Sequence, residues 1–341
     1  MSALQVLWFL LIGVLLTVFA ILDGFDLGVG FWHLWTKKDK DRRLLLNSVG
    51  PVWDGNEVWL LTGGGAMFAA FPPVYATVFS GFYLAMILVI FALILRAVSG
   101  EFRSKEESPA WRTTWDVAFS VGSILAALLF GVALGNILRG IPLDANGNYA
   151  GTFLTLLNPY ALMIGLVGLA MIAFHGALYI VLRAQAALET SARKWAFSSG
   201  IVYLVLFILS GIVTVGTQSH LLKNYSSFPL FWLVPVLVLV FIVLALVFTR
   251  KENAGKAFLF SSLSIAATMG IVGINLFPRL VPALGDPSLS LTAANSSSSA
   301  LALKSMLIIT IIGLPVVIGY TIWVYKAFKG KVDVEAEYNH Y

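Results

Sequence analysis

The sequence predicts an all-α integral membrane protein, and two observations carry that prediction. Hydrophobic residues make up 59% of the 341 residues and charged residues only 11%, whereas a soluble domain carries about 25% charged residues. Apolar stretches of about 20 residues, long enough to cross a bilayer as a helix, recur along the chain. The sequence contains no cysteine, which excludes disulfides and thiolate-ligated metal centres. We therefore expect a single transmembrane domain over residues 1–341.

Nine stretches are predicted to span the membrane as helices. They lie at residues 4–36, 53–72, 74–99, 114–138, 158–183, 195–217, 229–249, 256–278 and 301–328. The first stretch has neither a basic flank nor a small-residue cleavage site. It is therefore expected to be retained as a span and not removed as a signal peptide.

The distribution of Lys and Arg predicts the orientation in the membrane. Eighteen of the 22 basic residues lie in the first, third, fifth and seventh connections and in the C-terminal tail. The opposite side holds only Arg139, Lys223, Arg279 and Lys304. Because cytoplasmic loops are enriched in Lys and Arg, the N-terminus is predicted to lie outside and the C-terminus in the cytoplasm. Topology then explains the basic surplus, and no nucleic-acid partner is expected.

Four acids lie where the apolar pattern predicts lipid. Asp23 and Asp26 interrupt the first stretch, and Asp54 and Glu57 open the second. Members of each pair are three residues apart and share a helix face. A carboxylate in hydrocarbon is costly, so such a residue is a functional candidate by default. The topology places all four at one depth in the cytoplasmic half, which predicts proton uptake from the cytoplasm. Arg96 is assigned to the third connection, so no basic residue is expected in the membrane to neutralise them.

Two structural interpretations of these acids stay open. The segment from Asp54 to Glu57 fits a capping box at a helix N-terminus, with an acid at the cap and Glu three residues later. Asp23 and Asp26 could instead hydrogen-bond to neighbouring helices as polar contacts that hold the bundle together. Capping does not exclude proton transfer.

Histidine tests whether the chain holds haem, because haem iron needs axial ligands such as His or Met. Of the four histidines, only His175 is predicted to lie deep in the membrane. His33 is placed at the inner interface, His220 in an outer loop and His340 in the tail. A satisfied interhelical hydrogen bond is the favoured role of His175. We expect no metal site and no complete catalytic site in this chain.

Six ordered blocks of sequence point to a family. They are DGFDLGVG at 23–30, RRLLLNS at 42–48, WDGNEVWL at 53–60, GGGAMFAA at 63–70, FSGFY at 79–83 and GVALGN at 131–136. Together they resemble subunit II of the cytochrome bd-type quinol oxidases. The resemblance extends over essentially the whole chain and is densest before residue 140.

The resemblance implies a fold, a reaction and partners. It implies two four-helix bundles plus a peripheral helix, in the cytoplasmic membrane of a bacterium or archaeon. The main partner is a homologous subunit I, which carries the quinol site, two haems b and one haem d, so this chain binds no haem directly. The complex oxidises quinol, reduces dioxygen to water and takes protons from the cytoplasm. The resemblance also admits a structural quinone in this subunit and a small single-helix accessory subunit.

The resemblance also assigns roles to particular residues. The first Asp of DGFD is Asp23 and the Asp of WDGN is Asp54. In the family these positions lie near the subunit interface, on a proposed proton route towards the haems. Asp26 and Glu57 match the other polar positions of the two motifs, without an assigned role. The position of Glu57 often holds an amide in relatives.

Other functions remain to be separated from this one. A proton- or ion-coupled secondary transporter would also place acids inside helices. It would show broken helices at matching places in two halves of the chain, whereas the acids here occur only in the first pair of spans. A scaffold for the haem subunit, with the acids as polar contacts, is the third interpretation.

Overall fold

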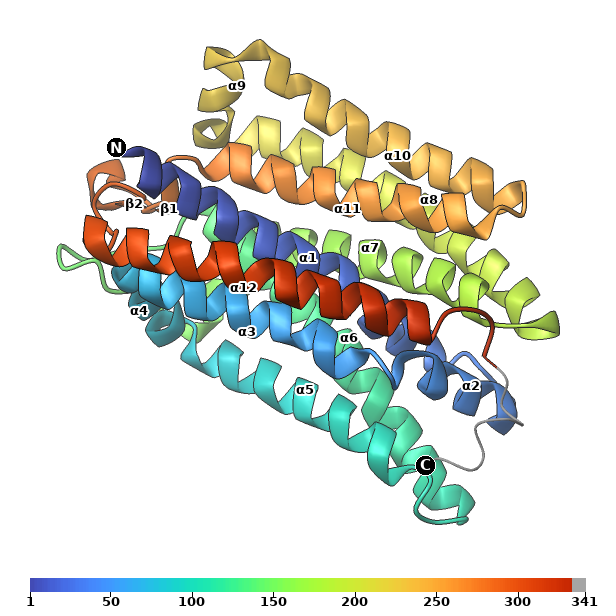
Figure 1. Ribbon diagram of the computed structural model, residues 1–341. Helices are drawn as coiled ribbons and strands as arrows, with labels where there is room; N and C mark the ends of the chain where they lie inside the picture. Colours follow the sequence, from blue (N-terminus) through green and yellow to red (C-terminus); the bar gives the residue numbers. More distant parts are fainter. Residues whose placement is uncertain (333–341) are drawn as a thin grey trace.

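The computed structural model describes residues 1–332, which are mostly helical (Figure 1). The α-helices are α1 (Ala3–His33), α2 (Asp39–Val49), α3 (Trp53–Ala70), α4 (Pro72–Gly81), α5 (Tyr83–Phe102), α6 (Pro109–Arg139), α7 (Pro159–Arg183), α8 (Ala186–Thr217), α9 (Lys223–Ser227), α10 (Leu233–Arg250), α11 (Ala254–Leu276) and α12 (Ala300–Ala327). The 3-10 helices are η1 (Phe153–Leu156), η2 (Ser219–Leu222), η3 (Pro229–Trp232) and η4 (Pro287–Leu289). Strands β1 (Arg279–Val281) and β2 (Leu291–Thr292) pair antiparallel in the connection before α12.

Eight helices of the described chain are long and apolar enough to cross a membrane, which confirms the all-α membrane class. Each coincides with one of the predicted stretches. The stretch predicted at 53–72 forms α3, which is not among the eight because Asp54, Asn56 and Glu57 make its first two turns polar. The stretch predicted at 74–99 is divided, since α4 ends at Gly81 and α5 starts at Tyr83. A ninth span therefore stays a prediction.

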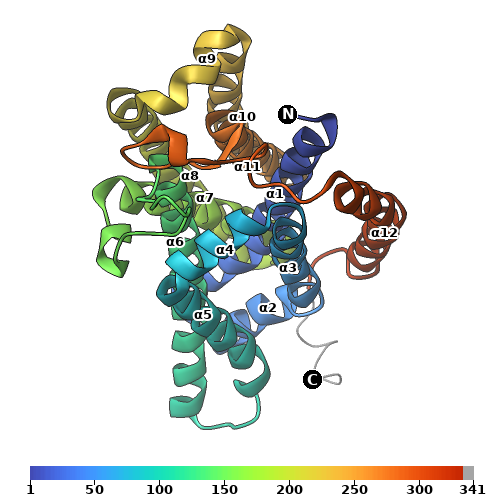
Figure 2. The ribbon, with the colours of Figure 1, turned by 90° about the vertical axis from the view of Figure 1, so that its left-hand side faces the viewer.

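The long helices form two packed groups (Figures 1 and 2). In the first group, α1 contacts α3 and α6, and α6 contacts α5. In the second group, α7 packs on α8 and α11, and α10 packs on α8 and α11. The two groups are joined by α6, which packs along α7, and by α1, which contacts α7 and α11. Helix α12 lies at the edge, where it contacts α1 and α3, and Figure 2 shows it standing apart from the other helices.

Glycines bring α1 and α7 into backbone contact at the centre of the protein. A Cβ added to Gly28 would lie 2.3 Å from the carbonyl oxygen of Ile172 and 2.7 Å from Cα of Gly176. A Cβ on Gly176 would lie 2.3 Å from the carbonyl carbon of Gly28. Helices approach this closely in membranes when small residues line the contact. The contact fixes the half of α1 that carries the acids.

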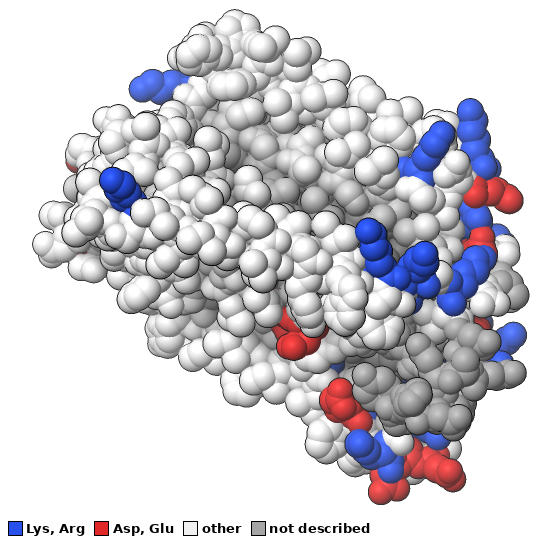
Figure 3. All heavy atoms as spheres, viewed as in Figure 1, with Lys and Arg blue, Asp and Glu red and all other residues white. Residues whose placement is uncertain are grey.

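Most Lys and Arg side chains on the face shown in Figure 3 gather at one end of the helices, where α12 ends and α2 begins. Few basic side chains are visible at the opposite end. This asymmetry supports the predicted orientation, with the basic end at the cytoplasm. The orientation itself stays a prediction.

Candidate functional site

The two acids of α1 are fully buried inside the helical bundle. Asp23 and Asp26 both have an exposed fraction of 0%. They lie three residues apart, so both side chains reach the same side of α1. Their side chains face α5 and the start of α3, as the contacts below show.

A buried arginine from α5 lies among these acids. Nη2 of Arg96 is 2.8 Å from Oδ1 of Asp23 and 3.9 Å from Oδ2 of Asp26. Nη1 of Arg96 is 3.9 Å from Oε1 of Glu57, and its guanidinium lies 5.8 Å from the ring centre of Trp53. The expectation that no basic residue neutralises the acids was therefore wrong. Helix α5 continues to Phe102, so Arg96 sits well inside the helix and is only 3% exposed.

Polar side chains from two other helices complete the cluster. Nδ2 of Asn56 donates to Oδ2 of Asp26 at 2.7 Å and to the carbonyl oxygen of Leu22 at 3.4 Å. The hydroxyl of Tyr325 in α12 donates to Oδ1 of Asn56 at 2.8 Å. The peripheral helix is therefore tied to the acids through one amide. We call Asp23, Asp26, Asn56, Glu57, Arg96 and Tyr325 the carboxylate cluster.

Asp54 does not join the carboxylate cluster, so three of the four predicted acids converge and one does not. Its side chain is exposed and makes no hydrogen bond or ion pair with the described residues. The cap residue of α3 is Val52, and no side chain accepts a hydrogen bond there. The capping-box interpretation of Asp54 and Glu57 was therefore wrong. Glu57, whose side chain is 21% exposed, lies between the exposed Asp54 and the buried acids of α1.

The charges of the carboxylate cluster are not balanced. Three carboxyl groups share one guanidinium, and a guanidinium stays protonated in proteins. Both oxygens of Asp23, Oδ1 of Asp26 and both Nη atoms of Arg96 make no hydrogen bond of good geometry among the described residues. Unpaired buried charge is costly. The arrangement can therefore carry protons on its carboxyl groups and exchange them as the nearby charge changes.

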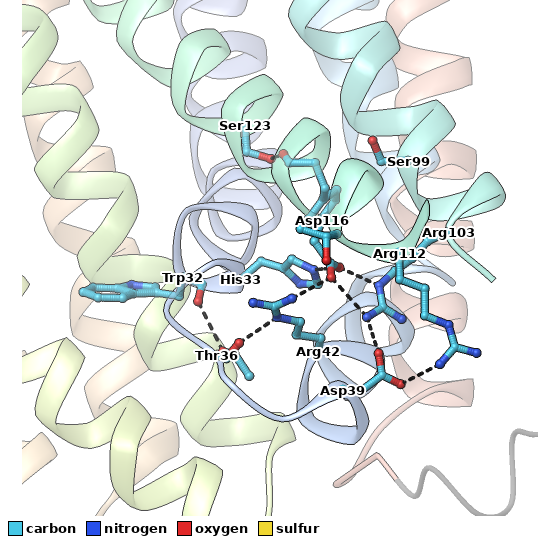
Figure 4. A network of polar contacts seen from close by, with 12 residues as sticks. Trp32, His33, Thr36, Asp39, Arg42, Ser99, Arg103, Arg112, Asp116 and Ser123 are labelled. Atoms are coloured by element: carbon cyan, nitrogen blue, oxygen red, sulfur yellow. Dashed lines mark hydrogen bonds and ion pairs between the residues drawn. The ribbon is translucent and has the colours of Figure 1, made fainter. Parts of the chain in front are cut away.

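A second charged network closes the basic end of the first helical group (Figure 4). Asp116 of α6 lies at its centre: Oδ1 is 2.5 Å from Nε2 of His33 and 2.5 Å from Nε of Arg103, and Oδ2 is 2.7 Å from Nη1 of Arg42. Arg103 also donates to Asp39 at 2.6 Å. The network joins the end of α1, the start of α2, the end of α5 and the start of α6. His33, predicted at the interface, is fully buried.

His175 is held between helices by both ring nitrogens. Nε2 lies 3.1 Å from the carbonyl oxygen of Ile21, so this nitrogen carries the proton, and Nδ1 lies 2.6 Å from Oγ of Ser261. The ring stacks on Phe258 at 4.5 Å. The predicted interhelical hydrogen bond is confirmed. Both nitrogens are engaged, so His175 does not fit as an axial ligand of a haem.

Sequence reasoning missed Arg96, Asn56 and Tyr325. Arg96 lay inside the predicted limits 74–99 and so could have been placed in the membrane. Asn56 stands between Asp54 and Glu57 in the same polar turn. Tyr325 is separated from Asn56 by most of the chain, and no local pattern predicts that they meet.

Known subunits II of cytochrome bd oxidases match this chain over nearly its whole length. The family model described as cytochrome bd terminal oxidase subunit II matches residues 4–328. The chain is 38% identical to the cytochrome bd-I ubiquinol oxidase subunit 2 of Escherichia coli K12 over 365 residues, which cover 98% of this chain and 96% of the relative. It is 37% identical to the cytochrome bd ubiquinol oxidase subunit 2 of Bacillus subtilis over 335 residues, 98% of each chain. A chain in the structure of bd oxidase from Geobacillus thermodenitrificans matches the fold with a TM-score of 0.79 at 18% identity, covering 96% of this chain and 99% of that chain.

Proposed function

The chain belongs to the family of cytochrome bd terminal oxidase subunit II, and we propose that it is the haem-free second subunit of a bd-type oxidase that oxidises quinol and reduces dioxygen to water. The names of its relatives support the reaction. The engaged nitrogens of His175 support a chain that binds no haem itself. The haem-bearing subunit I, with two haems b and one haem d, is the proposed partner. This chain scaffolds it in the cytoplasmic membrane, with nine spans, an outer N-terminus and a cytoplasmic C-terminus.

The chain also contributes to proton uptake from the cytoplasm. One observation carries this proposal: the burial of the acids increases from the exposed start of α3 to the half of α1 inside the bundle. Asp54 is exposed, Glu57 is partly buried, and Asp23 and Asp26 are fully buried. Asp54 takes up the proton at the surface, and Glu57 passes it inward. Asp23 and Asp26 hold it within the bundle.

Arg96 supports this path without carrying a proton itself. Its guanidinium stays charged, so it stabilises whichever carboxylate is ionised at a given moment. The distances of 2.8 Å to Asp23 and 3.9 Å to both Asp26 and Glu57 allow one cation to serve all three acids. Asn56 donates to Asp26 and orients it. The chemistry of dioxygen reduction belongs to the haems of the partner, and this chain delivers protons for the water that is formed.

The test replaces Asp23 and Asp54 one at a time with Asn in the complex purified through this chain. Asn has nearly the same size but cannot ionise, so we expect the quinol oxidation rate to fall by about tenfold or more, with haem content unchanged. Asp286→Asn is the matched control, because Asp286 is exposed and accepts a hydrogen bond from the backbone of Ser288 that Asn can also accept.

The same variants separate proton transfer from structural support. If Asp23→Asn and Asp54→Asn lose haem together with activity, the acids act as polar contacts that hold the complex together. If both variants keep full activity, neither acid lies on the route. Only retained haem with a slowed rate supports proton uptake through these residues.

A further inference from the structure

A cavity of about 510 Å³ opens beside the carboxylate cluster at the basic end of the protein. It lies among α1, α7, α11 and the end of α12, with the end of α2 and the turn before α3 on one side. Aromatic rings form much of its lining: Phe25 stacks on Tyr179 at 4.0 Å, and Phe258 and Tyr325 lie edge-on to Phe25 at 6.1 Å and 6.4 Å. The volume falls within the range of small-molecule sites, about 300–1,000 Å³.

The charged groups that line the cavity are both cations. Arg183 is the last residue of α7, and Lys329 follows α12. No Asp or Glu is among the described lining residues. Arg183 donates to the backbone carbonyls of Phe328 and Gly330, so it fixes the backbone on both sides of Lys329. The cavity therefore combines an apolar interior with a net positive charge.

The hydrogen bonds around the two cations leave donors for a ligand. Nη1 of Arg183 is engaged by two backbone carbonyls and its Nε is buried, so Arg183 contributes its positive charge and Lys329 supplies the free donors. Lys329 is exposed and makes no ion pair with the described residues. Hydroxyls are less available, since that of Tyr179 donates to the carbonyl oxygen of Ser48 at 2.7 Å and that of Tyr325 to Asn56. An anion held here would contact Arg183 and Lys329.

We propose that this cavity binds an anionic phospholipid, with its phosphate between Arg183 and Lys329 and the upper part of an acyl chain against Phe25 and Phe258. The position supports a membrane lipid, because both cations stand at the basic ends of α7 and α12. Basic pockets between transmembrane helices on the cytoplasmic side are suited to acidic lipid head groups. A free phosphate would not fill the apolar interior of the cavity. A zwitterionic lipid would not neutralise the positive charge of Arg183 and Lys329.

The lipid would lie two hydrogen bonds away from the acids of α1. Tyr325 lines the cavity and donates to Asn56, which donates to Asp26. A bound lipid would hold the end of α12 against α7 and so keep Tyr325 in place. The binding site itself stands on the cavity and its cations, whether or not the acids carry protons.

The test measures lipid retention by the purified complex. The complex is stripped in mild detergent, exposed to equal amounts of deuterated phosphatidylglycerol and phosphatidylcholine, and analysed by native mass spectrometry. We expect the wild type to retain phosphatidylglycerol over phosphatidylcholine. Lys329→Glu changes the charge of the site by two units, and each unit is worth about fivefold in affinity. The substitution should therefore weaken phosphatidylglycerol binding by about 25-fold.

Two variants complete the test. Lys251→Glu is the matched control, because Lys251 is exposed at the end of α10 on the same basic side and does not line the cavity; it should leave retention unchanged. Leu182→Trp fills the cavity without changing its charge and should reduce retention of the lipid. Equal retention in Lys329→Glu and the wild type would overturn the proposal. Equal retention of phosphatidylglycerol and phosphatidylcholine by the wild type would also overturn it. Retention of a quinone and of neither lipid would do the same.

Discussion

Replacement of Arg96 with Gln tests the charge arrangement of the carboxylate cluster most sharply. Arg96 is the one cation that the structure places within 4.0 Å of Asp23, Asp26 and Glu57 in the described chain. Its loss leaves the buried carboxyl groups of Asp23 and Asp26 and the partly buried one of Glu57 without a counter-charge. Removing one partner of a buried ion pair costs about 3–5 kcal/mol. The carboxyl groups can offset part of this cost by taking up protons, so we expect a loss near the lower end of the range.

The assay is unfolding of the purified complex in mixed detergent micelles, followed together with haem content and oxygen consumption. Arg96→Gln should lower the free energy of unfolding by about 3 kcal/mol and also slow quinol oxidation. Arg250→Gln is the matched control, since Arg250 is exposed and packs over the ring of Phe197 at 4.3 Å. Loss of an exposed cation–π contact of this kind is expected to cost about 0.5–1 kcal/mol, well below the loss expected for Arg96→Gln.

A double-variant cycle then isolates the contact with Asp23. Asp23→Asn in the Arg96→Gln background should cost less than it does in the wild type, because the carboxylate has already lost its partner. If Arg96→Gln is as stable and as active as Arg250→Gln, the guanidinium does not hold the acids, and the reasoning is refuted. Equal costs of Asp23→Asn in both backgrounds would show that the two groups are not coupled.

Four further outcomes follow from the described contacts. Gly176→Ala should push α1 and α7 apart and lower the free energy of unfolding by about 1–3 kcal/mol. Gly273→Ala is the control, because an added Cβ there meets open space and should cost little. Unfolding in detergent compares the stability of the two variants. Tyr325→Phe removes one hydrogen bond to Asn56 and should lower the free energy of unfolding by about 0.5–1.5 kcal/mol; an unchanged value would contradict the contact. Asp116→Asn leaves the guanidinium groups of its network without their shared carboxylate, so we expect a loss of about 3–5 kcal/mol and little assembled complex, judged by haem yield. Burial lowers the pKa of His220, which lies outside the spans. The unfolded chain therefore binds the proton more readily, and the stability should fall as the pH drops through about 6.5. Thermal denaturation of His220→Gln should show a weaker pH dependence.

The sequence predicted the class, the positions of eight long helices and the placement of Asp23 and Asp26 away from water, because each of these depends on local pattern. Asp23 and Asp26 interrupt an apolar stretch long enough to span the bilayer, and their burial follows from that stretch alone. The helices at 4–36 and 158–183 were placed within a few residues for the same reason.

The partners of the acids could not be predicted in the same way, because they depend on how helices pack. Arg96 lies near the end of an apolar stretch, where a connecting loop and a buried position have the same local pattern. The structure settles its place only through the length and direction of α5. Tyr325 reaches Asn56 across the chain, because the peripheral helix α12 packs along α1 and α3.

The division of the stretch 74–99 into α4 and α5 coincides with a tertiary contact. Gly81 ends α4 where a Cβ would lie 2.5 Å from Cβ of Tyr149, a residue of the loop after α6. The hydropathy of the stretch does not reveal this contact. Asp54 likewise shares its local pattern with Glu57, yet only Glu57 turns towards Arg96.

The most direct test of the account is a reduced-minus-oxidised absorbance spectrum of the complex that purifies through a tag on this chain, recorded with its rate of quinol oxidation. We expect bands of haem b and haem d, a large second subunit and quinol oxidation that consumes dioxygen. A colourless chain that purifies alone and does not oxidise quinol would contradict the account, and a coupled transporter would then be the better interpretation of its buried acids.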